Sequence, residues 1–432
     1  MSRKSLYIAG SVIAAAIVIA TASSIFHKPI PKPEPLAPMP VRLNLSITND
    51  DSQLPELAGL DRKIEQYMRK WQFKGASLAI TRGDSLLYAK GYGWADEEKE
   101  IKMEPGHILR MASVSKLITA TGIMVLQDRG LLNIKDTVFG PAGILRDSLF
   151  IGTIKDRNYH KITVEHLLRH QGGFYRDPVF SSRDVKHQMG LDRVPEREDF
   201  YRLVLSRRLR FMPGEWQSYS NFGYILLSEI IEEVSGRPYE DFIKEEVLAP
   251  AGCYDMHIAG SYYDDRRDNE VRYYTHEGDG KYIEEYTDSG IMVERCYGGN
   301  NIPLLSGAGA WCGSPIEIAR LVACIDGTPQ IPDIISSESF ALMTEYFDTE
   351  TFSLGWNDTC PSKGWSRSGT LSGTCALVRH YPDGECWIMI TNTSTWKGPK
   401  QARYTDDLFR QCRELYSDRL PKRNLFEQIP TV

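Results

Sequence analysis

The chain has 432 residues, 42% of them hydrophobic, which is enough for one large domain or for two to three smaller ones with a substantial core. Its formal net charge is -6 with both signs interspersed, which argues against a nucleic-acid-binding protein. We therefore expect a globular protein that does not bind nucleic acid.

The N-terminus carries an export or anchoring segment. Arg3 and Lys4 precede an uncharged stretch, Ser5–Phe26, that is rich in Ile, Val and Ala. This pattern is typical of either a signal peptide or a single membrane span. Residues 1–26 are thus predicted to be cleaved off or kept as a membrane anchor. The rest of the chain should then lie outside the cytoplasm, in the periplasm, because the positive charges stay inside.

Residues 27–56 are predicted to be a linker. From His27 to Pro40, proline alternates with other residues, which is incompatible with a helix or a sheet and favours a semi-rigid polyproline II spacer. From about Leu57 the pattern changes, and we assign residues 57–432 to the folded domain.

The folded domain is predicted to begin with a helix at 57–71 and two strands, GASLAIT and LLYAKGYGWA, joined by a turn at 82–84. Residues 135–295 are predicted to form a mostly helical subdomain, although 255–295 gives a weak pattern. A helix near 314–325, two or three strands between 353 and 392, and a last helix near 400–416 follow. The fold class is therefore α+β: an antiparallel sheet built from both chain ends and flanked by helices, with a mostly helical inserted domain.

Eight cysteines become relevant if the chain is exported, because disulfides persist in oxidising compartments. Segments 375–381 and 385–392 are predicted to pair as a hairpin, with Cys386 opposite residue 380 or 381. Cys375 would then lie about 17–20 Å from Cys386, which excludes a bond between these two. For the other cysteines, a disulfide and a buried thiol remain equally open.

The first candidate for chemistry is Ser113, three positions before Lys116 at the start of an apolar helix. Residues three apart share a helix face, so the ammonium group would lie beside the hydroxyl. Burial would lower the pKa of the lysine and allow its neutral amine to accept a proton. The alternative is a capping serine beside a surface lysine. A second SxxK match, Ser394 to Lys397, lies in a predicted loop after a strand.

Two further segments contain candidate residues. Tyr219 and Asn221 flank Ser220 just before a predicted helix, where they would supply a phenol and an amide, unless the segment is only a helix cap. Arg367 begins the strand-like segment Arg367–Thr370, in which Gly369 would let a ligand backbone lie close. The arginine would bind a carboxylate, unless it is a solvated residue on an edge strand.

Together, SxxK, YxN and a cationic residue followed by xG resemble, in order, the motifs of the penicilloyl serine enzymes. The chain is similar to the branch of that family that contains class C β-lactamases, DD-peptidases and related esterases. The segments that carry the resemblance lie between about residues 57 and 415. They are HILRMASVSKLITATGIMVLQDRGLLNIKDTV, ITVEHLLRHQGGF, FMPGEWQSYSNFGYILLSEIIEEVSGRPY and SGAGAWCGSPIEIARL.

The resemblance implies roles for the candidate residues. Ser113 would be the acylated nucleophile, Lys116 and Tyr219 would handle its proton, and Asn221 would orient the substrate. The segment of Arg367, Ser368, Gly369 and Thr370 would bind substrate, with the backbone amides of Ser113 and Thr370 as the oxyanion hole. The family usually has Lys or His at the position of Arg367, a departure that leaves β-lactam hydrolysis open. We expect this arginine to clamp a substrate carboxylate.

The expected function is an exported serine hydrolase that acts on D-amino-acid peptides, such as those of peptidoglycan, or on a related amide. The alternatives are a carboxylesterase of the same fold and a non-catalytic protein that binds the cell wall. No cofactor and no metal are expected. His166 and His170 have the i, i+4 spacing of a zinc pair, but Leu167 replaces the glutamate of HExxH. The glycine-rich GAGAWCG at 307–313 lacks the spacing of a phosphate loop.

Overall fold

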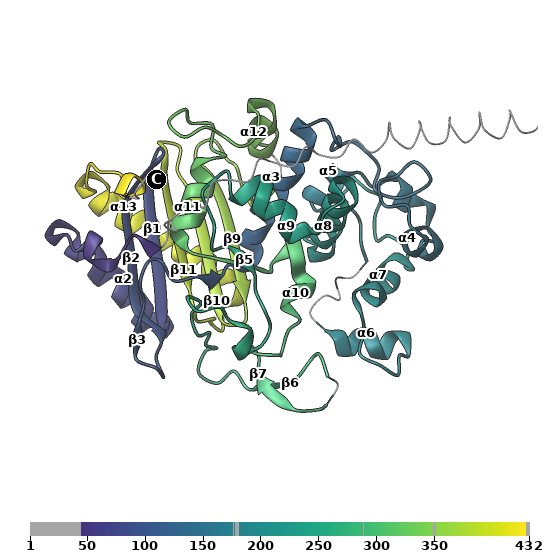
Figure 1. Cartoon of the computed structure of the whole chain (residues 1–432), viewed down its shortest axis with the longest axis horizontal. Coiled ribbons are helices and arrows are strands. Elements are labelled where there is room, and N and C mark those ends of the chain that lie inside the picture. Colours follow the sequence, from purple (N-terminus) through teal and green to yellow (C-terminus); the bar gives the residue numbers. More distant parts are fainter. Residues whose placement is uncertain (1–44, 176, 178–180, 288, 349–350, 429–432) are drawn as a thin grey trace, which may run out of the picture. The chain divides into compact units, whose positions relative to one another are not determined.

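The centre of the protein is a six-stranded antiparallel sheet with strand order β3-β2-β1-β11-β10-β9 (Figure 1). The computed structural model describes residues 45–428 except 176, 178–180, 288 and 349–350. The strands of this sheet are β1 (Gly75–Arg82), β2 (Ser85–Asp96), β3 (Ile101–Lys102), β9 (Trp365–Leu371), β10 (Thr374–His380) and β11 (Glu385–Thr391).

The sheet is completed by the two ends of the folded region, as the sequence predicts. The early strand β1 pairs with the late strand β11, with Ala79 opposite Ile388. In the β10–β11 hairpin, Cys386 lies opposite His380, which confirms the predicted register. Each tight hairpin turn contains a glycine with positive φ, Gly83 at 54° and Gly384 at 84°, a conformation that side chains disfavour.

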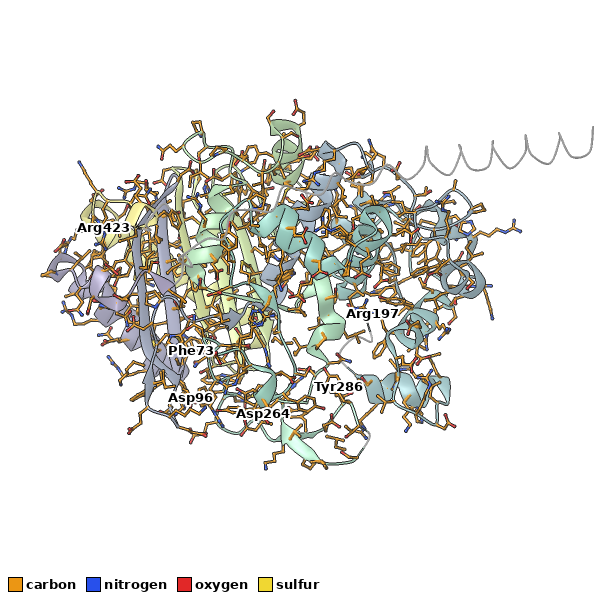
Figure 2. The ribbon with its side chains drawn as sticks, in the orientation of Figure 1. Phe73, Asp96, Arg197, Asp264, Tyr286 and Arg423 are labelled. Atoms are coloured by element: carbon orange, nitrogen blue, oxygen red, sulfur yellow. The ribbon has the colours of Figure 1, made fainter. Side chains whose placement is uncertain are left out.

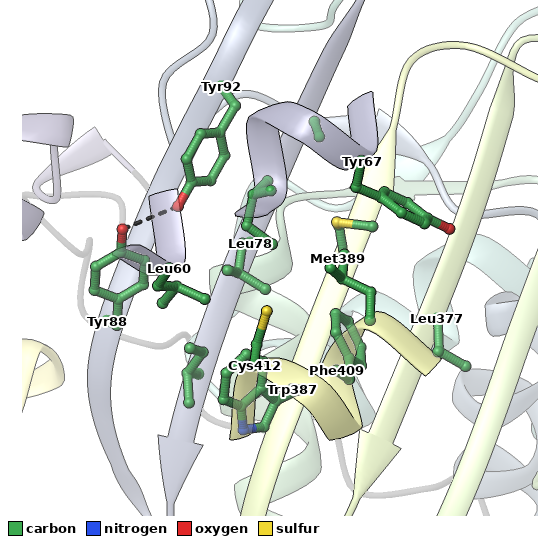
Figure 3. Packing of buried hydrophobic residues seen from close by; sticks show 14 of the residues in the cluster. Leu60, Tyr67, Leu78, Tyr88, Tyr92, Leu377, Trp387, Met389, Phe409 and Cys412 are labelled. Carbon is green, nitrogen blue, oxygen red and sulfur yellow. Dashed lines mark hydrogen bonds between the residues drawn. The ribbon is translucent and has the colours of Figure 1, made fainter. Parts of the chain in front are cut away.

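Helices cover both faces of this sheet. Helices α2 (Ala58–Trp71) and α13 (Gln401–Tyr416) pack on one face, where Leu60, Phe409 and Cys412 meet Leu78 and Trp387 of the strands (Figure 3). The opposite face of β1 is also buried, and α11 (Pro315–Ala323) packs against β1 and β11. Because both faces are covered here, β1, β10 and β11 are buried along almost their whole length.

A helical region is inserted between β3 and β9, as predicted (Figure 1). From 135 to 250 the regular elements are helical, whereas 255–295 holds three short strands and one 3₁₀ turn, Tyr263–Asp265. The helices outside the sheet layers are α3 (Ser115–Asp128), α4 (Ser148–Thr153), α5 (Val164–Leu168), α6 (Ser182–Met189), α7 (Arg197–Leu205), α8 (Asn221–Ser235), α9 (Tyr239–Ile243), α10 (Ile302–Leu305) and α12 (Ser337–Thr344).

Two small sheets lie in this region. One pairs β6 (Lys281–Ile283) with β7 (Met292–Glu294). The other has the order β4-β8-β5 and consists of β4 (Leu109–Arg110), β8 (Trp311–Gly313) and β5 (His257–Ile258). Strand β4 leads directly into the segment that contains Ser113.

The predicted linker, residues 27–56, extends too far at its C-terminal end. Residues 45–56 pack on the domain: Ile47 is buried, and the side chains of Asn49 and Ser52 accept hydrogen bonds from the backbone of Gly91 and Ala89 in β2. These contacts cap the edge of the sheet, so this stretch belongs to the folded domain. Residues 1–26 and the proline-rich stretch 27–40 lie outside the described residues. Among the helices of the described part of the chain, none is long and apolar enough to cross a membrane.

All eight cysteines are free thiols, and seven of them are buried. The sequence leaves disulfides and buried thiols open, and the structure has thiols rather than disulfides. Burial raises the pKa of Cys375 to about 12, because the thiolate would lose its hydration.

Candidate active site

The segment that carries Ser113 is a single 3₁₀ turn, Ala112–Val114, between β4 and α3. Ala112 has a φ of 49°, a left-handed conformation that alanine disfavours, and it turns the chain sharply just before the serine. Every residue of α3 from Ser115 to Leu126 is buried, so the helix fixes this turn from behind. Ser113 itself is only partly buried.

Lys116 is fully buried beneath Ser113. Its Nζ donates hydrogen bonds to Ser113 Oγ at 3.2 Å, to Asn221 Oδ1 at 2.8 Å and to the Ala308 carbonyl at 2.6 Å. Burial lowers the pKa of Lys116 to about 8, because the ammonium form is poorly solvated there. The alternative of a surface lysine is therefore wrong, and the amine is available to exchange a proton near neutral pH.

Tyr219 lies on the other side of the same hydroxyl. Its phenol donates to Ser113 Oγ at 2.7 Å, while its ring is 40% exposed and so forms part of the open side of the site. Burial of the phenol would raise the pKa of Tyr219, but the cations of Lys116 and Arg367 lower it to about 8. Ser113 thus has a proton-exchanging group within hydrogen-bond distance on each side.

The start of helix α8 places Tyr219 and Asn221. Ser220 is the N-cap, its hydroxyl accepting from Gly223 N at 3.1 Å, while the residues on either side of it face the site. Asp177 adds to the cap by accepting from the Asn221 backbone amide. The interpretation of this segment as a helix cap is correct for Ser220. The side chain of Asn221 instead accepts a hydrogen bond from Lys116.

His170 supports the tyrosine and is not paired with His166. Helix α5 ends at Leu168, and His170 has a φ of 59°, so the two histidines do not share a helix face. The His170 ring packs on the Tyr219 ring at 4.4 Å between centroids, and its Nδ1 accepts from Ser220 N at 3.2 Å. Burial lowers the pKa of His170, since a charged ring would be unsolvated beside Lys116 and Arg367.

Arg367 lies under the site and is only 1% exposed. Its Nε donates to the Ser113 carbonyl at 2.7 Å and its Nη2 to the Tyr219 phenol at 3.1 Å. Its Nη1 has no hydrogen-bond partner among the described residues. The reading of a solvated edge-strand arginine is wrong, because both contacts tie the guanidinium to the nucleophile segment and to Tyr219.

The free edge of β9 faces the turn of Ser113. The backbone amides of Ser366 and Ser368 point out of the sheet at this edge, to Asp358 O at 2.9 Å and Asn357 Oδ1 at 2.8 Å. Because the strand repeats every two residues, the Thr370 amide points to the same edge. A Cβ on Gly369 would lie 2.1 Å from Met111 O, so only glycine allows this approach.

The structure therefore brings together Ser113, Lys116, Tyr219, Asn221 and Arg367, and it puts Ser368, Gly369 and Thr370 on the adjacent strand edge. The sequence did not identify the supporting residues. The Ala308 carbonyl belongs to the glycine-rich stretch, in which a Cβ on Gly307 would lie 2.8 Å from Thr119 Oγ1. Glycine enrichment marks this stretch, but the stretch lacks the spacing of a phosphate loop and gives no sign of a carbonyl that binds lysine. Asp177 has no local sequence pattern, and the spacing of His170 from His166 does not indicate its stacking on Tyr219.

Comparison with known proteins places the chain among serine hydrolases. The sequence model of the Beta-lactamase family matches residues 60–410. Penicillin-binding protein 4* of Bacillus subtilis (strain 168) is 32% identical over 203 residues, 46% of this chain and 41% of that protein. Protein flp of Staphylococcus aureus (strain MW2) is 30% identical over 208 residues, 47% of this chain and 38% of that protein. These matches span less than half the length of either relative.

Solved structures share the fold. A penicillin-binding protein homologue from Pyrococcus abyssi superposes with a TM-score of 0.61 at 22% identity, over 84% of this chain and 80% of that chain. The D-amino acid amidase from Ochrobactrum anthropi SV3 has a TM-score of 0.62 at 19% identity, over 84% and 100%. EstCE1, a hydrolase with promiscuous acyltransferase activity, has a TM-score of 0.63 at 20% identity, over 83% and 98%. The β-lactamase/transpeptidase-like fold predicted from the sequence is confirmed.

Proposed function

This chain belongs to the Beta-lactamase family of serine hydrolases, and from that premise we propose that it forms an acyl-enzyme at Ser113 on D-amino-acid peptides or a related amide. The observation that carries the proposal is the pair of contacts on one hydroxyl: Lys116 Nζ at 3.2 Å and the Tyr219 phenol at 2.7 Å from Ser113 Oγ. A hydroxyl between two groups that exchange protons near neutral pH is an activated nucleophile.

In the proposed reaction, Ser113 Oγ attacks the carbonyl carbon of the substrate while its proton passes to the Lys116–Tyr219 pair. The backbone amides of Ser113 and Thr370 stabilise the oxyanion, which is the largest expected contribution to catalysis. The pair then returns the proton to the leaving amine, and an acyl-ester remains on Ser113. Water, deprotonated by the same pair, hydrolyses this ester and regenerates the hydroxyl.

The substrate class and the location are part of this proposal. The D-amino acid amidase carries a name that points to D-amino-acid amides, and Penicillin-binding protein 4* carries one that points to penicillin; the first name supports a peptide or amide of that kind. The basic and apolar N-terminal residues support export to the periplasm, either secreted or held at the membrane through residues 1–26. There the peptides of the cell wall would be within reach.

The test is covalent labelling with a fluorescent penicillin and, separately, with a fluorophosphonate. Ser113→Ala should abolish labelling, whereas Ser394→Ala, the serine of the second SxxK match, should label like the wild type. Intact-protein mass spectrometry should show one acyl adduct. Undiminished labelling of Ser113→Ala would disprove the assignment of the nucleophile, and muropeptide binding without acylation by either probe would point to the non-catalytic alternative.

One observation favours a carboxylesterase as the second candidate. The guanidinium of Arg367 is buried and bonded to Ser113 and Tyr219, so two of its three nitrogen atoms are not offered to a substrate carboxylate. A site without a strong carboxylate clamp accepts neutral esters. Turnover of a D-Ala-D-Ala peptide compared with that of a short acyl ester distinguishes the two functions, and a large preference for the ester would replace the peptide proposal.

A further inference from the structure

A second polar cluster lies in the small sheet behind the nucleophile turn. Cys312 of β8 is directly opposite His257 of β5 on one side and Arg110 of β4 on the other. Residues directly opposite one another in adjacent antiparallel strands present their side chains on the same face. The register of this sheet therefore brings an imidazole and a thiol together beside Arg110, which is three residues before Ser113 in the chain.

Glu270 completes the cluster from a loop that forms a bridge with Ile108 beside β4. Its Oε2 lies 3.5 Å from His257 Nε2, and its Oε1 accepts from Cys312 Sγ at 3.4 Å. One ligand atom from each of the three residues lies within 4.8 Å of the other two. Their exposed fractions are 2%, 6% and 0% for His257, Glu270 and Cys312, so water does not stabilise the carboxylate.

Arg110 stabilises the Glu270 carboxylate only from a distance, without a direct ion pair. The guanidinium of Arg110 donates to the backbone carbonyls of Cys296 and Gly260, at 2.8 and 2.9 Å, and makes no ion pair within 4.0 Å of Glu270. Within the described residues, His257 is the one basic group that close to this carboxylate. A buried carboxylate needs a cation or several donors nearby, because burial of an isolated charge is costly.

His257 is oriented as a ligand. Its Nδ1 lies 2.9 Å from the backbone carbonyl of Asp255, which fixes Nδ1 as the N–H donor. In the neutral ring the lone pair is on Nε2, which is buried, has no hydrogen-bond partner among the described residues and lies 3.5 Å from Glu270 Oε2. Histidines that bind metals commonly donate their other N–H to a backbone carbonyl in this way.

We propose that His257, Glu270 and Cys312 bind a divalent transition metal of the zinc type. One nitrogen, one oxygen and one sulfur ligand suit this borderline-soft ion. Ligand atoms on one zinc ion with ordinary bond lengths lie about 3.4–3.6 Å apart, and Glu270 meets this spacing with a different oxygen on each side: Oε2 is 3.5 Å from His257 Nε2, and Oε1 is 3.4 Å from Cys312 Sγ. Binding would release the thiol proton of Cys312, so the ion with one thiolate and one carboxylate is neutral.

The site would be structural rather than catalytic. The Tyr273 hydroxyl, 2.7 Å from Glu270 Oε1 and 3.4 Å from Cys312 Sγ, stands at the fourth side of the cluster. The same hydroxyl accepts from the Arg110 backbone amide at 2.8 Å. A metal would thus hold β5, β8 and the loop of Glu270 together and stiffen the strand that leads into Ser113.

Glu270 also lines a surface cavity of about 230 Å³ together with Asp96, His107 and Asp268, which offers an ion a route towards the cluster. In Figure 2, Asp96 is labelled near the lower edge of the domain. The same cavity is lined by Lys99, Arg266 and Arg267, so it carries charges of both signs.

The experiment uses the full chain, stripped of metal with a chelator and then titrated with Co²⁺. We expect one equivalent to bind, with thiolate-to-cobalt charge-transfer absorption that zinc abolishes by displacement. Alkylation followed by peptide mapping should show that zinc protects Cys312. The absence of a stoichiometric metal, or protection of another cysteine instead, would overturn the proposal. This readout needs no variant and does not depend on the hydrolase activity.

Cys312→Ala should lose the charge-transfer band, whereas Cys324→Ala, which removes another buried thiol, should keep it. Circular dichroism and labelling at Ser113 check that each variant folds. If Cys312→Ala does not fold, His257→Gln takes its place and should weaken cobalt binding at least tenfold. Retention of the band in a folded Cys312→Ala protein, or unchanged affinity in His257→Gln, would refute the assignment.

Discussion

Two buried cations on either side of Ser113 are in opposite electrostatic states. Lys116 has neutral oxygen atoms as its three hydrogen-bond partners, and burial lowers its pKa to about 8. Arg110 is equally inaccessible, and burial disfavours its charge, but Tyr273 and Glu270 nearby keep its pKa above the ordinary value. The same short segment of chain therefore carries one cation that can release a proton and one that cannot.

The difference shows that burial alone does not make a residue reactive. Lys116 is beside a hydroxyl at the open side of the protein, and its neutral form is chemically useful. Arg110 holds two backbone carbonyls and lies over the Tyr273 ring at 4.2 Å, so its permanent charge organises the chain. We expect that disturbing the first residue affects rates and that disturbing the second affects stability.

The largest expected effect is on the reactivity of Ser113, through Lys116 and Tyr219. Lys116→Met and Tyr219→Phe should each lower the rate of acylation about 10²–10⁴-fold, because each removes part of one proton pathway. The double variant should be nearly as active as the worse single variant, since groups that act as a unit are not additive. Stopped-flow or gel-based labelling of the three variants measures this. Losses that add in the logarithm of the rate would show that the two groups act independently.

The second largest expected effect tests the structural role of Arg110. Arg110→Met should lower the free energy of unfolding by about 2–4 kcal/mol, because two buried carbonyl groups lose charged donors. Urea denaturation followed by circular dichroism measures this, and labelling per folded molecule should change only a few-fold. Arg69→Met is the matched control: the Arg69 side chain is 68% exposed, so its loss should cost under about 0.5 kcal/mol. If Arg110→Met kept its stability but lost labelling, Arg110 would have a catalytic rather than a structural role.

Arg367 is a third buried cation, and it belongs with Lys116 among the residues that affect rates. Its variants refine the comparison between Lys116 and Arg110. The sequence predicts a carboxylate clamp, whereas its contacts with Ser113 and Tyr219 suggest that it positions the phenol. Arg367→Ala should therefore slow a peptide acid and its C-terminal amide equally, about 10–100-fold. Arg367→Lys should recover part of the rate, and Ser368→Ala serves as a neighbouring control. A loss of rate confined to the peptide acid would instead support the role of Arg367 as a carboxylate clamp.

The fold was predictable from the sequence because its elements have strong local patterns. The helix of α2, the β1–β2 hairpin and the β10–β11 register follow from periodicity and turn residues, and each is confirmed. The error at residues 45–56 has a physical reason. Asn49 and Ser52 are held by hydrogen bonds to β2, which is far away in sequence, and polar side chains in such a role look like those of a linker.

Within the site, the residues with motif spacing were found and their supports were not. Ser113, Lys116, Tyr219 and Asn221 meet because two helix starts face each other, which the motif order anticipates. The Ala308 carbonyl and the His170 ring contribute through backbone geometry and stacking, and neither depends on a local pattern. The cluster of His257 and Cys312 depends on strand register between β5 and β8, which no spacing in the sequence reveals.

The smallest expected effect concerns pH. Lys116 and Tyr219 both have a pKa of about 8, so as a coupled pair they should lose a proton with an apparent pKa near that value. The pair accepts the Ser113 proton only after losing its own, so acylation should rise with pH, about tenfold between pH 7 and pH 9. An uncharged fluorophosphonate isolates this step from substrate ionisation, and its spontaneous hydrolysis is subtracted at each pH. Removing the charge in Arg367→Ala raises both pKa values, so the rise should move to higher pH, because this cation lowers them in the wild type. A flat wild-type profile across this range, or a shift to lower pH in the variant, would mean that the proton of Ser113 leaves by another route.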